Sequence, residues 1–179
     1  MKLRNKIVSG IVGLSIPLLA FAAPFGNDAD IADAKKVWEA SVAAGFVGEN
    51  AIVTRPYTGA PPHGMILELM EKMVTIDGVT GPLVVKKNYG GDGLTVNDVI
   101  GDPNKYLKAV TIQFQREAGY DKENKNWFYG KYLPDGSLDA NPKGVKLAGR
   151  VAKGAPTCCI ACHKAAPGGD YIFNHDRYK

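Results

Sequence analysis

Three cysteines lie close together near the C-terminal end of the chain, and a histidine follows the last of them. They are Cys158, Cys159 and Cys162, with His163 as the next residue. Residues 159–163 read Cys-Ile-Ala-Cys-His, which is the C-x-x-C-H spacing of c-type haem attachment. In that chemistry two thiols add across the two vinyl groups of haem, and the adjacent imidazole binds the iron. The pattern predicts one covalent haem c on Cys159 and Cys162, with His163 as the iron ligand.

Two other interpretations of these residues stay open. A redox-active disulfide also uses two cysteines separated by two residues, although it does not need the histidine. A zinc site would need a fourth ligand, for which the sequence offers only Cys158 and His175 nearby. If haem is attached to Cys159 and Cys162, Cys158 is left as a spare thiol or forms an intermolecular disulfide. Alternatively, Cys158 is itself the first cysteine of the motif.

The first residues of the chain have the pattern of an export signal. Residues 1–6 are basic, residues 7–21 are apolar, and Ala-Phe-Ala at 20–22 fits a cleavage site. A short membrane anchor is the alternative interpretation. We expect a cleaved signal peptide at 1–22, a single domain at 23–179 and a periplasmic location. Removing the signal lowers the net charge from +4 to +1. This balance argues against a nucleic-acid partner.

Hydrophobic spacing predicts one early helix followed by strands. The helix covers residues 28–45, with Asn27 or Asp28 as its cap. Residues 139–157 contain Gly and Pro and are expected to form a loop that leads to the cysteines. Apolar alternation or β-branched residues predict strands at 81–89, 109–117 and 127–133, a shorter one at 51–57, and either helix or strand at 65–73.

These elements predict an α+β fold, mainly an antiparallel β-sheet with one or two flanking helices and a C-terminal haem c attachment motif. Only 16 residues follow His163, and none is methionine. This excludes the small cytochromes c that take a downstream methionine as sixth ligand. A four-helix bundle is excluded because the chain lacks four long amphipathic helices.

Several short segments, taken in order, carry a resemblance to a known family. They are Pro-His-Gly at 62–64, Gly-Pro-Leu-Val-Val-Lys-Lys at 81–87, Arg-Glu-Ala-Gly-Tyr-Asp at 116–121, Asn-Trp-Phe at 126–128, Tyr-Leu-Pro-Asp-Gly at 132–136 and Asp-Tyr-Ile-Phe at 170–173. With the haem motif, this ordered set resembles the cytochrome P-460 family, which includes the cytochromes c-prime-beta. The resemblance implies a β-rich homodimer whose haem iron is five-coordinate, with an open face opposite the motif histidine.

The two branches of this family differ in chemistry. In the P-460 branch a lysine is bonded to the haem ring and hydroxylamine is oxidised, whereas the c-prime-beta branch has an apolar cap and binds nitric oxide. The family's cross-linking lysine lies five residues after a glycine, as Lys86 lies after Gly81. Strand alternation places Lys86 and Lys87 on opposite faces, so we expect Lys86 inside the pocket and Lys87 in solvent. Alternatively, both are charges on an edge strand.

The oxidation of hydroxylamine also needs groups that accept protons. The P-460 branch has a glutamate about 25 residues after its lysine, where this chain has Thr111, with Gln113 on the same strand face. Neither is an acid, which predicts weak hydroxylamine oxidation. Glu68 is a further carboxylate that could point inward, or else be a solvated surface charge. The candidate catalytic residues are therefore Lys86, Thr111, Gln113 and Glu68.

Three functions follow as hypotheses. The first is a haem-dependent oxidoreductase that acts on hydroxylamine or a related small nitrogen compound and passes electrons to another cytochrome. The second is a cytochrome that binds nitric oxide without turnover. The third is an electron carrier in which His63 or His175 supplies a sixth iron ligand; the alternative for each is an ordinary surface or turn histidine.

Overall fold

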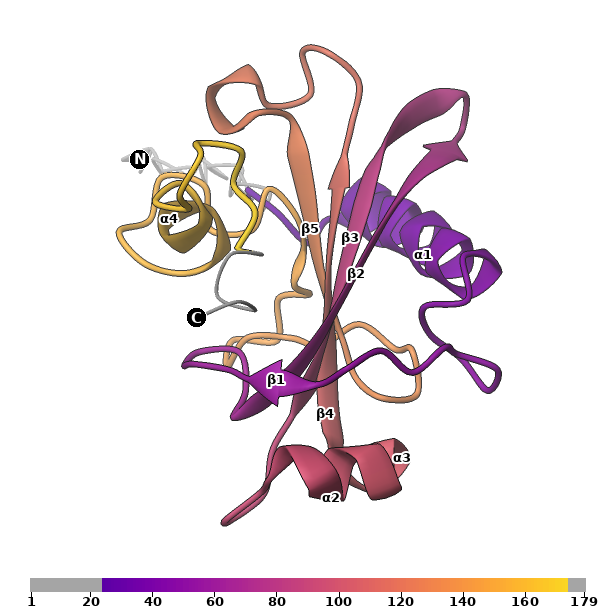
Figure 1. Cartoon of the computed structure of the whole chain (residues 1–179). Coiled ribbons are helices and arrows are strands. Elements are labelled where there is room, and N and C mark those ends of the chain that lie inside the picture. Colours follow the sequence, from indigo (N-terminus) through magenta and orange to yellow (C-terminus); the bar gives the residue numbers. More distant parts are fainter. Residues whose placement is uncertain (1–23, 174–179) are drawn as a thin grey trace, which may run out of the picture.

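The computed structural model describes residues 24–173 and contains a six-stranded antiparallel sheet. The predicted signal peptide and His175 lie outside the described residues. The strands are neighbours in space in the same order as along the chain, so the sheet is a meander (Figure 1). The strands are β1 (Tyr57–Thr58), β2 (Ile66–Ile76), β3 (Val79–Tyr89), β4 (Leu107–Gln115), β5 (Trp127–Tyr132) and β6 (Ala148–Gly149).

The predicted early helix is confirmed as α1 (Asp28–Ala43). Asn27 and Asp30 form its capping box, in which each side chain accepts a hydrogen bond from the other residue's backbone N–H. Within residues 24–173 no helix is long and apolar enough to cross a bilayer. The described helices also include four short ones, which are α2 (Val96–Gly101), α3 (Pro103–Tyr106), the 3-10 turn η1 (Lys122–Asn124) and α4 (Cys159–His163).

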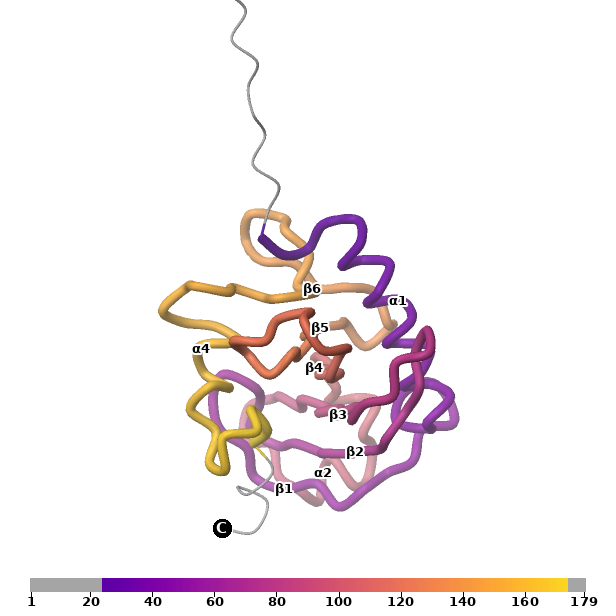
Figure 2. Tube along the Cα trace, turned by 90° about the horizontal axis from the view of Figure 1, so that it is seen from above, coloured from indigo at the N-terminus to yellow at the C-terminus, as the bar shows by residue number. Residues whose placement is uncertain are grey.

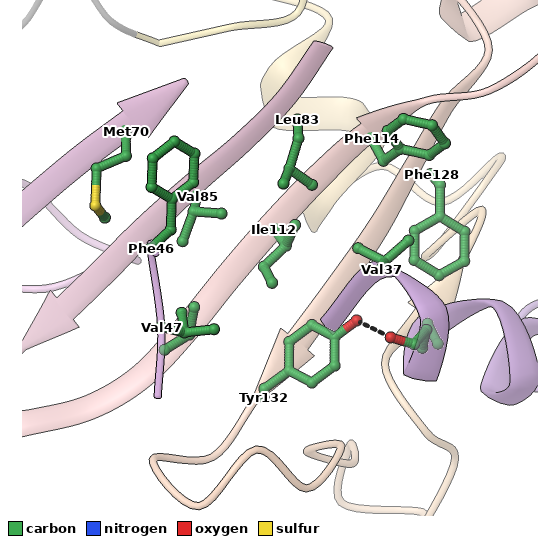
Figure 3. Close-up of a cluster of buried hydrophobic side chains, with 13 residues drawn as sticks. Val37, Phe46, Val47, Met70, Leu83, Val85, Ile112, Phe114, Phe128 and Tyr132 are labelled. Carbon is green, nitrogen blue, oxygen red and sulfur yellow. Dashed lines mark hydrogen bonds between the residues drawn. The ribbon is translucent and has the colours of Figure 1, made fainter. Parts of the chain in front are cut away.

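One face of the sheet packs against α1. Figure 3 shows this core, in which side chains from β2 to β5 meet α1 and the residues that follow it. The hydroxyl of Tyr132 donates a hydrogen bond to the carbonyl of Ala34 at 2.8 Å, which fixes the helix to β5. Leu83, Val85 and Phe114 are almost completely buried on this face.

The other face of the sheet is covered by the C-terminal part of the chain. A second apolar cluster joins Leu69, Val84 and Tyr129 of the sheet to Ile160 of α4 and Ile172. Figures 1 and 2 show α1 and α4 on opposite sides of the sheet. Because side chains alternate along a strand, the position of a strand residue decides whether it faces α1 or α4.

Most strand predictions are confirmed, with ends that differ by one or two residues. The ambiguous segment 65–73 is a strand. In the segment predicted as a loop, 139–157, the structure has one short strand, the two-residue β6. The strand predicted at 51–57 is wrong except at its last residue. The backbone N–H of Thr54 donates instead to the carboxylate of Glu68, at 2.6 Å, so it forms no strand ladder.

Candidate functional site

A cavity of about 590 Å³ lies between the sheet and α4. Its volume is within the roughly 300–1,000 Å³ of typical cofactor and ligand sites. Its walls are mostly apolar, and in the described part of the chain no Asp or Glu lines it. The lining includes Leu69, Val84, Lys86, Thr111, Gln113, Tyr129, Cys158, Cys159, Cys162, His163, Ile172 and Phe173.

Helix α4 presents the residues of the C-x-x-C-H pattern to this cavity. Cys162 and His163 follow Cys159 by three and four residues, so all three lie on one face of the helix. The Nδ1 of His163 lies 2.7 Å from the carbonyl oxygen of Tyr171. Because a carbonyl only accepts, Nδ1 carries the proton and Nε2 is left with its lone pair. His163 therefore has the tautomer that a metal-binding histidine needs.

Aromatic rings hold the His163 imidazole in place. The rings of Phe173 and Tyr129 lie edge-on to it, with centres 5.4 and 5.5 Å away. Burial lowers the pKa of His163 below its usual value, because it disfavours the charged form. The neutral imidazole is the form that binds a metal.

Lys86 of β3 lines the cavity, so the expectation that it points inward is confirmed. Its side chain is only 6% exposed, and its ammonium donates to the carbonyl of Phe173 at 3.2 Å. In the sheet Lys86 lies directly opposite Leu69 of β2 and Thr111 of β4. Lys86 therefore lies beside the space that a bound cofactor would occupy.

Thr111 and Gln113 also line the cavity, on the face predicted for them. The amide nitrogen of Gln113 donates to the Tyr171 carbonyl at 3.1 Å, which is the same carbonyl that orients His163. Gln113 is therefore a positioning residue for His163. The hydroxyl of Thr111 lies within 3.2 Å of the Asn88 amide nitrogen, which donates to it.

The expected positions of Lys87 and Glu68 are wrong. Lys87 is 7% exposed rather than in solvent, and Glu68, a candidate catalytic residue, is fully buried on the α1 face, away from the cavity. The two are direct cross-strand partners, with Lys87 Nζ 3.5 Å from the Glu68 carboxylate. Glu68 also accepts hydrogen bonds from the Tyr89 hydroxyl and from Thr54. These contacts make the pair structural.

His63 is the residue whose position differs most from expectation. It lies in a turn, but its ring is partly buried and lines the cavity, so it is not an ordinary surface histidine. Its ring centre lies 5.9 Å from that of His163. Burial and the nearby charge of Lys86 lower the pKa of His63 to about 4. The imidazole is therefore neutral near pH 7.

No protein-family model matches the chain, and comparisons with curated proteins and with solved structures find no match. The interpretation of the site consequently depends on its own residues. Within residues 24–173 no three His, Cys, Asp or Glu side chains gather in a way that could hold a metal ion by themselves, which gives the zinc interpretation no support there. The residues do fit a haem. Two thiols and an oriented imidazole lie on one wall of an apolar cavity of suitable volume.

Proposed function

We propose that this chain is an exported monohaem c-type cytochrome that oxidises hydroxylamine, or a related small nitrogen compound, at a lysine-cross-linked haem. One observation supports this most strongly. The Cys159–His163 helix and Lys86 line the same cavity, although they are separated by more than 70 residues in the sequence. This is the combination that the resemblance to the cytochrome P-460 family implies.

Each of these residues has a distinct part in holding the haem. The thiols of Cys159 and Cys162 would add to the vinyl groups, which changes no oxidation state overall. Nε2 of His163 would bind the iron, since Nδ1 is engaged by Tyr171. A bond between the Lys86 amine and a ring carbon removes two protons and two electrons, so it needs an external oxidant such as peroxide. When bound, the haem supplies an iron site for a nitrogen ligand and accepts one electron at a time.

The chain itself supplies a mostly apolar lining. Leu69, Val84 and Phe173 contribute apolar surface, and the Thr111 hydroxyl is a neutral hydrogen-bonding group on the strand position opposite Lys86. Hydroxylamine must lose protons as it is oxidised, and because no Asp or Glu among residues 24–173 lines the cavity, we expect this step to be slow. Electrons leave to another cytochrome in the periplasm, and the family resemblance implies a homodimer.

A second function has its own support. The apolar lining and the absence of Asp and Glu from it among the described residues suit a neutral diatomic gas better than a protic substrate. The alternative is therefore a nitric-oxide-binding cytochrome of the c-prime-beta type. In that case nitric oxide binds tightly and hydroxylamine is not turned over.

The absorption spectrum of the purified ferrous protein, combined with acid–acetone extraction, tests the proposal. Haem that stays with the polypeptide after extraction supports covalent attachment, and a strongly red-shifted Soret band supports the cross-link. An unshifted c-type spectrum with tight nitric oxide binding would favour the second function. Haem that extracts freely would overturn both. In the control Cys159→Ala/Cys162→Ala both thioether bonds should be lost, and any haem that still resists extraction would have to be held by Lys86.

A further inference from the structure

Two imidazoles face the same cavity, and both are oriented by hydrogen bonds. His163 is held by the Tyr171 carbonyl, and Nδ1 of His63 lies 3.1 Å from Oδ1 of Asn88. The His63 contact does not depend on the turn alone, because Asn88 is in β3 and is only 3% exposed. The sheet thus contributes to the placement of His63.

The hydrogen bonds of Asn88 decide which nitrogen of His63 is protonated. The Asn88 amide nitrogen lies 3.0 Å from the Lys86 carbonyl and 3.2 Å from that of Ala109. Carbonyls only accept, so this end of the amide is the donor and Oδ1 is the acceptor that faces His63. Nδ1 of His63 therefore carries the proton. Nε2 keeps its lone pair, as in a metal-binding histidine.

The sheet also sets the separation of the two rings. Thr111 Oγ1 lies 3.4 Å from the His63 ring, while Gln113 shares the Tyr171 carbonyl with His163. Thr111 and Gln113 are successive positions on one face of β4, which are roughly 7 Å apart along a strand. The two imidazoles are thereby tied, directly or through the Tyr171 carbonyl, to successive cavity-facing positions of β4, which helps to fix the distance between them.

The distance between the two ring centres is compatible with both imidazoles binding a single iron. With metal–nitrogen bonds of about 2.0 Å, the centres of two imidazoles that share one metal lie roughly 6 Å apart. The observed separation is 5.9 Å. A histidine that only formed a hydrogen bond to an iron-bound ligand would lie about 2 Å farther away, since the ligand atom comes between.

We propose that His63 is an internal sixth ligand, which closes the iron site in the resting protein and which small ligands must displace. This rests on the proposed function, because it needs the haem that Cys159, Cys162 and His163 hold. It alters the expectation of an open distal face. Binding becomes a competition between the incoming nitrogen compound and His63. If the His63-bound state holds about 90% of the molecules, it weakens apparent ligand affinity roughly tenfold.

The test uses the ferric holoprotein, its spin state by electron paramagnetic resonance and absorption, and the kinetics of cyanide binding. The wild type should be low-spin, and its rate of cyanide binding should level off at high cyanide because His63 must leave first. In His63→Ala the iron should be high-spin, with cyanide affinity raised about tenfold or more. Added imidazole should restore the low-spin spectrum. Met65→Ala, which changes an exposed residue of the same segment, should behave as wild type.

The outcomes separate this inference from the proposed function. Covalent haem with a high-spin wild-type spectrum, unchanged by His63→Ala, would overturn the inference and leave the proposed function intact. A low-spin spectrum that persists in His63→Ala would also overturn it, and would assign the sixth position to another group, such as Lys86. Haem that is not attached to the wild type would overturn both. Because the cyanide kinetics are measured on the wild type, the test does not depend on the folding of the variant.

Discussion

Lys86 and Lys87 are consecutive residues with nearly equal burial, and their side chains lie on opposite faces of β3. Lys86 is 6% exposed and lines the cavity, whereas Lys87 is 7% exposed and lies beside Glu68 on the α1 face. The two lysines differ in environment but hardly in sequence context. Each is therefore a matched control for the other.

The first prediction concerns the cross-link. Peptide mass spectrometry should find a haem peptide that joins the segment with Cys159 and Cys162 to the segment with Lys86. Lys86→Arg should abolish it, because a guanidinium does not lose its proton and is a poor nucleophile. Lys87→Arg should leave it unchanged, since that side chain cannot reach the cavity. An unmodified Lys86 peptide from haem-loaded protein would rule the cross-link out.

The second prediction concerns stability. Lys87→Met leaves the fully buried Glu68 carboxylate without its cation, and we expect this to lower the free energy of unfolding by about 3 kcal/mol. The donors Tyr89 and Thr54 remain and limit the loss. The haem spectrum should not change. Urea denaturation measures the effect, with Lys72→Met, an exposed lysine of β2, expected to cost no more than about 0.5 kcal/mol.

The buried position of Lys87 shows where sequence reasoning stops. Alternation along residues 81–89 correctly places the two lysines on opposite faces, because a strand allows nothing else. Alternation does not show that the sheet face that carries Lys87 is also covered by other parts of the chain. That cover comes from distant segments, with the Lys87 ammonium donating to the carbonyl of Ile52 at 3.1 Å. Tertiary contacts of this kind leave no local pattern.

An element can be predicted from the sequence where a local signal marks it, and not where such a signal is absent. The strand identity of residues 65–73 could have been found from Asp77-Gly78, which link β2 to β3 and both have positive φ, as a two-residue hairpin turn requires. Thr95 and Asp98 similarly form a capping box that marks α2. The cavity position of His63 has no such signal, because a turn residue has no periodicity. Its contacts with Asn88, 25 residues away, and with Thr111 place it.

The third prediction concerns which cysteines would form the thioether bonds of the proposed haem. All three cysteines line the cavity, and the sulfurs of Cys158 and Cys159 are 3.9 Å apart. Only Cys159 lies in α4 on the face shared with Cys162 and His163. Cys158→Ala should therefore keep both thioether bonds, whereas Cys159→Ala should lose one. The pyridine haemochrome spectrum distinguishes one bond from two, and the opposite result would make Cys158 the first cysteine of the motif.

The last prediction tests whether having threonine rather than a carboxylate at position 111 limits hydroxylamine oxidation. Thr111 lies directly opposite Lys86 and lines the cavity, so a longer acidic side chain there would remain beside the haem. A positioned general base contributes about 10²–10⁴ in rate, and Thr111→Glu should raise turnover with an artificial acceptor by about tenfold or more. The side chain introduced by Thr111→Gln has nearly the same shape as that introduced by Thr111→Glu but cannot act as a base, so turnover should not increase. The carboxylate should also make turnover rise with pH through the pKa of the new group, a dependence that Thr111→Gln should lack. Equal rates in both variants, with haem content unchanged, would show that proton removal is not the limiting step and would favour the gas-binding function.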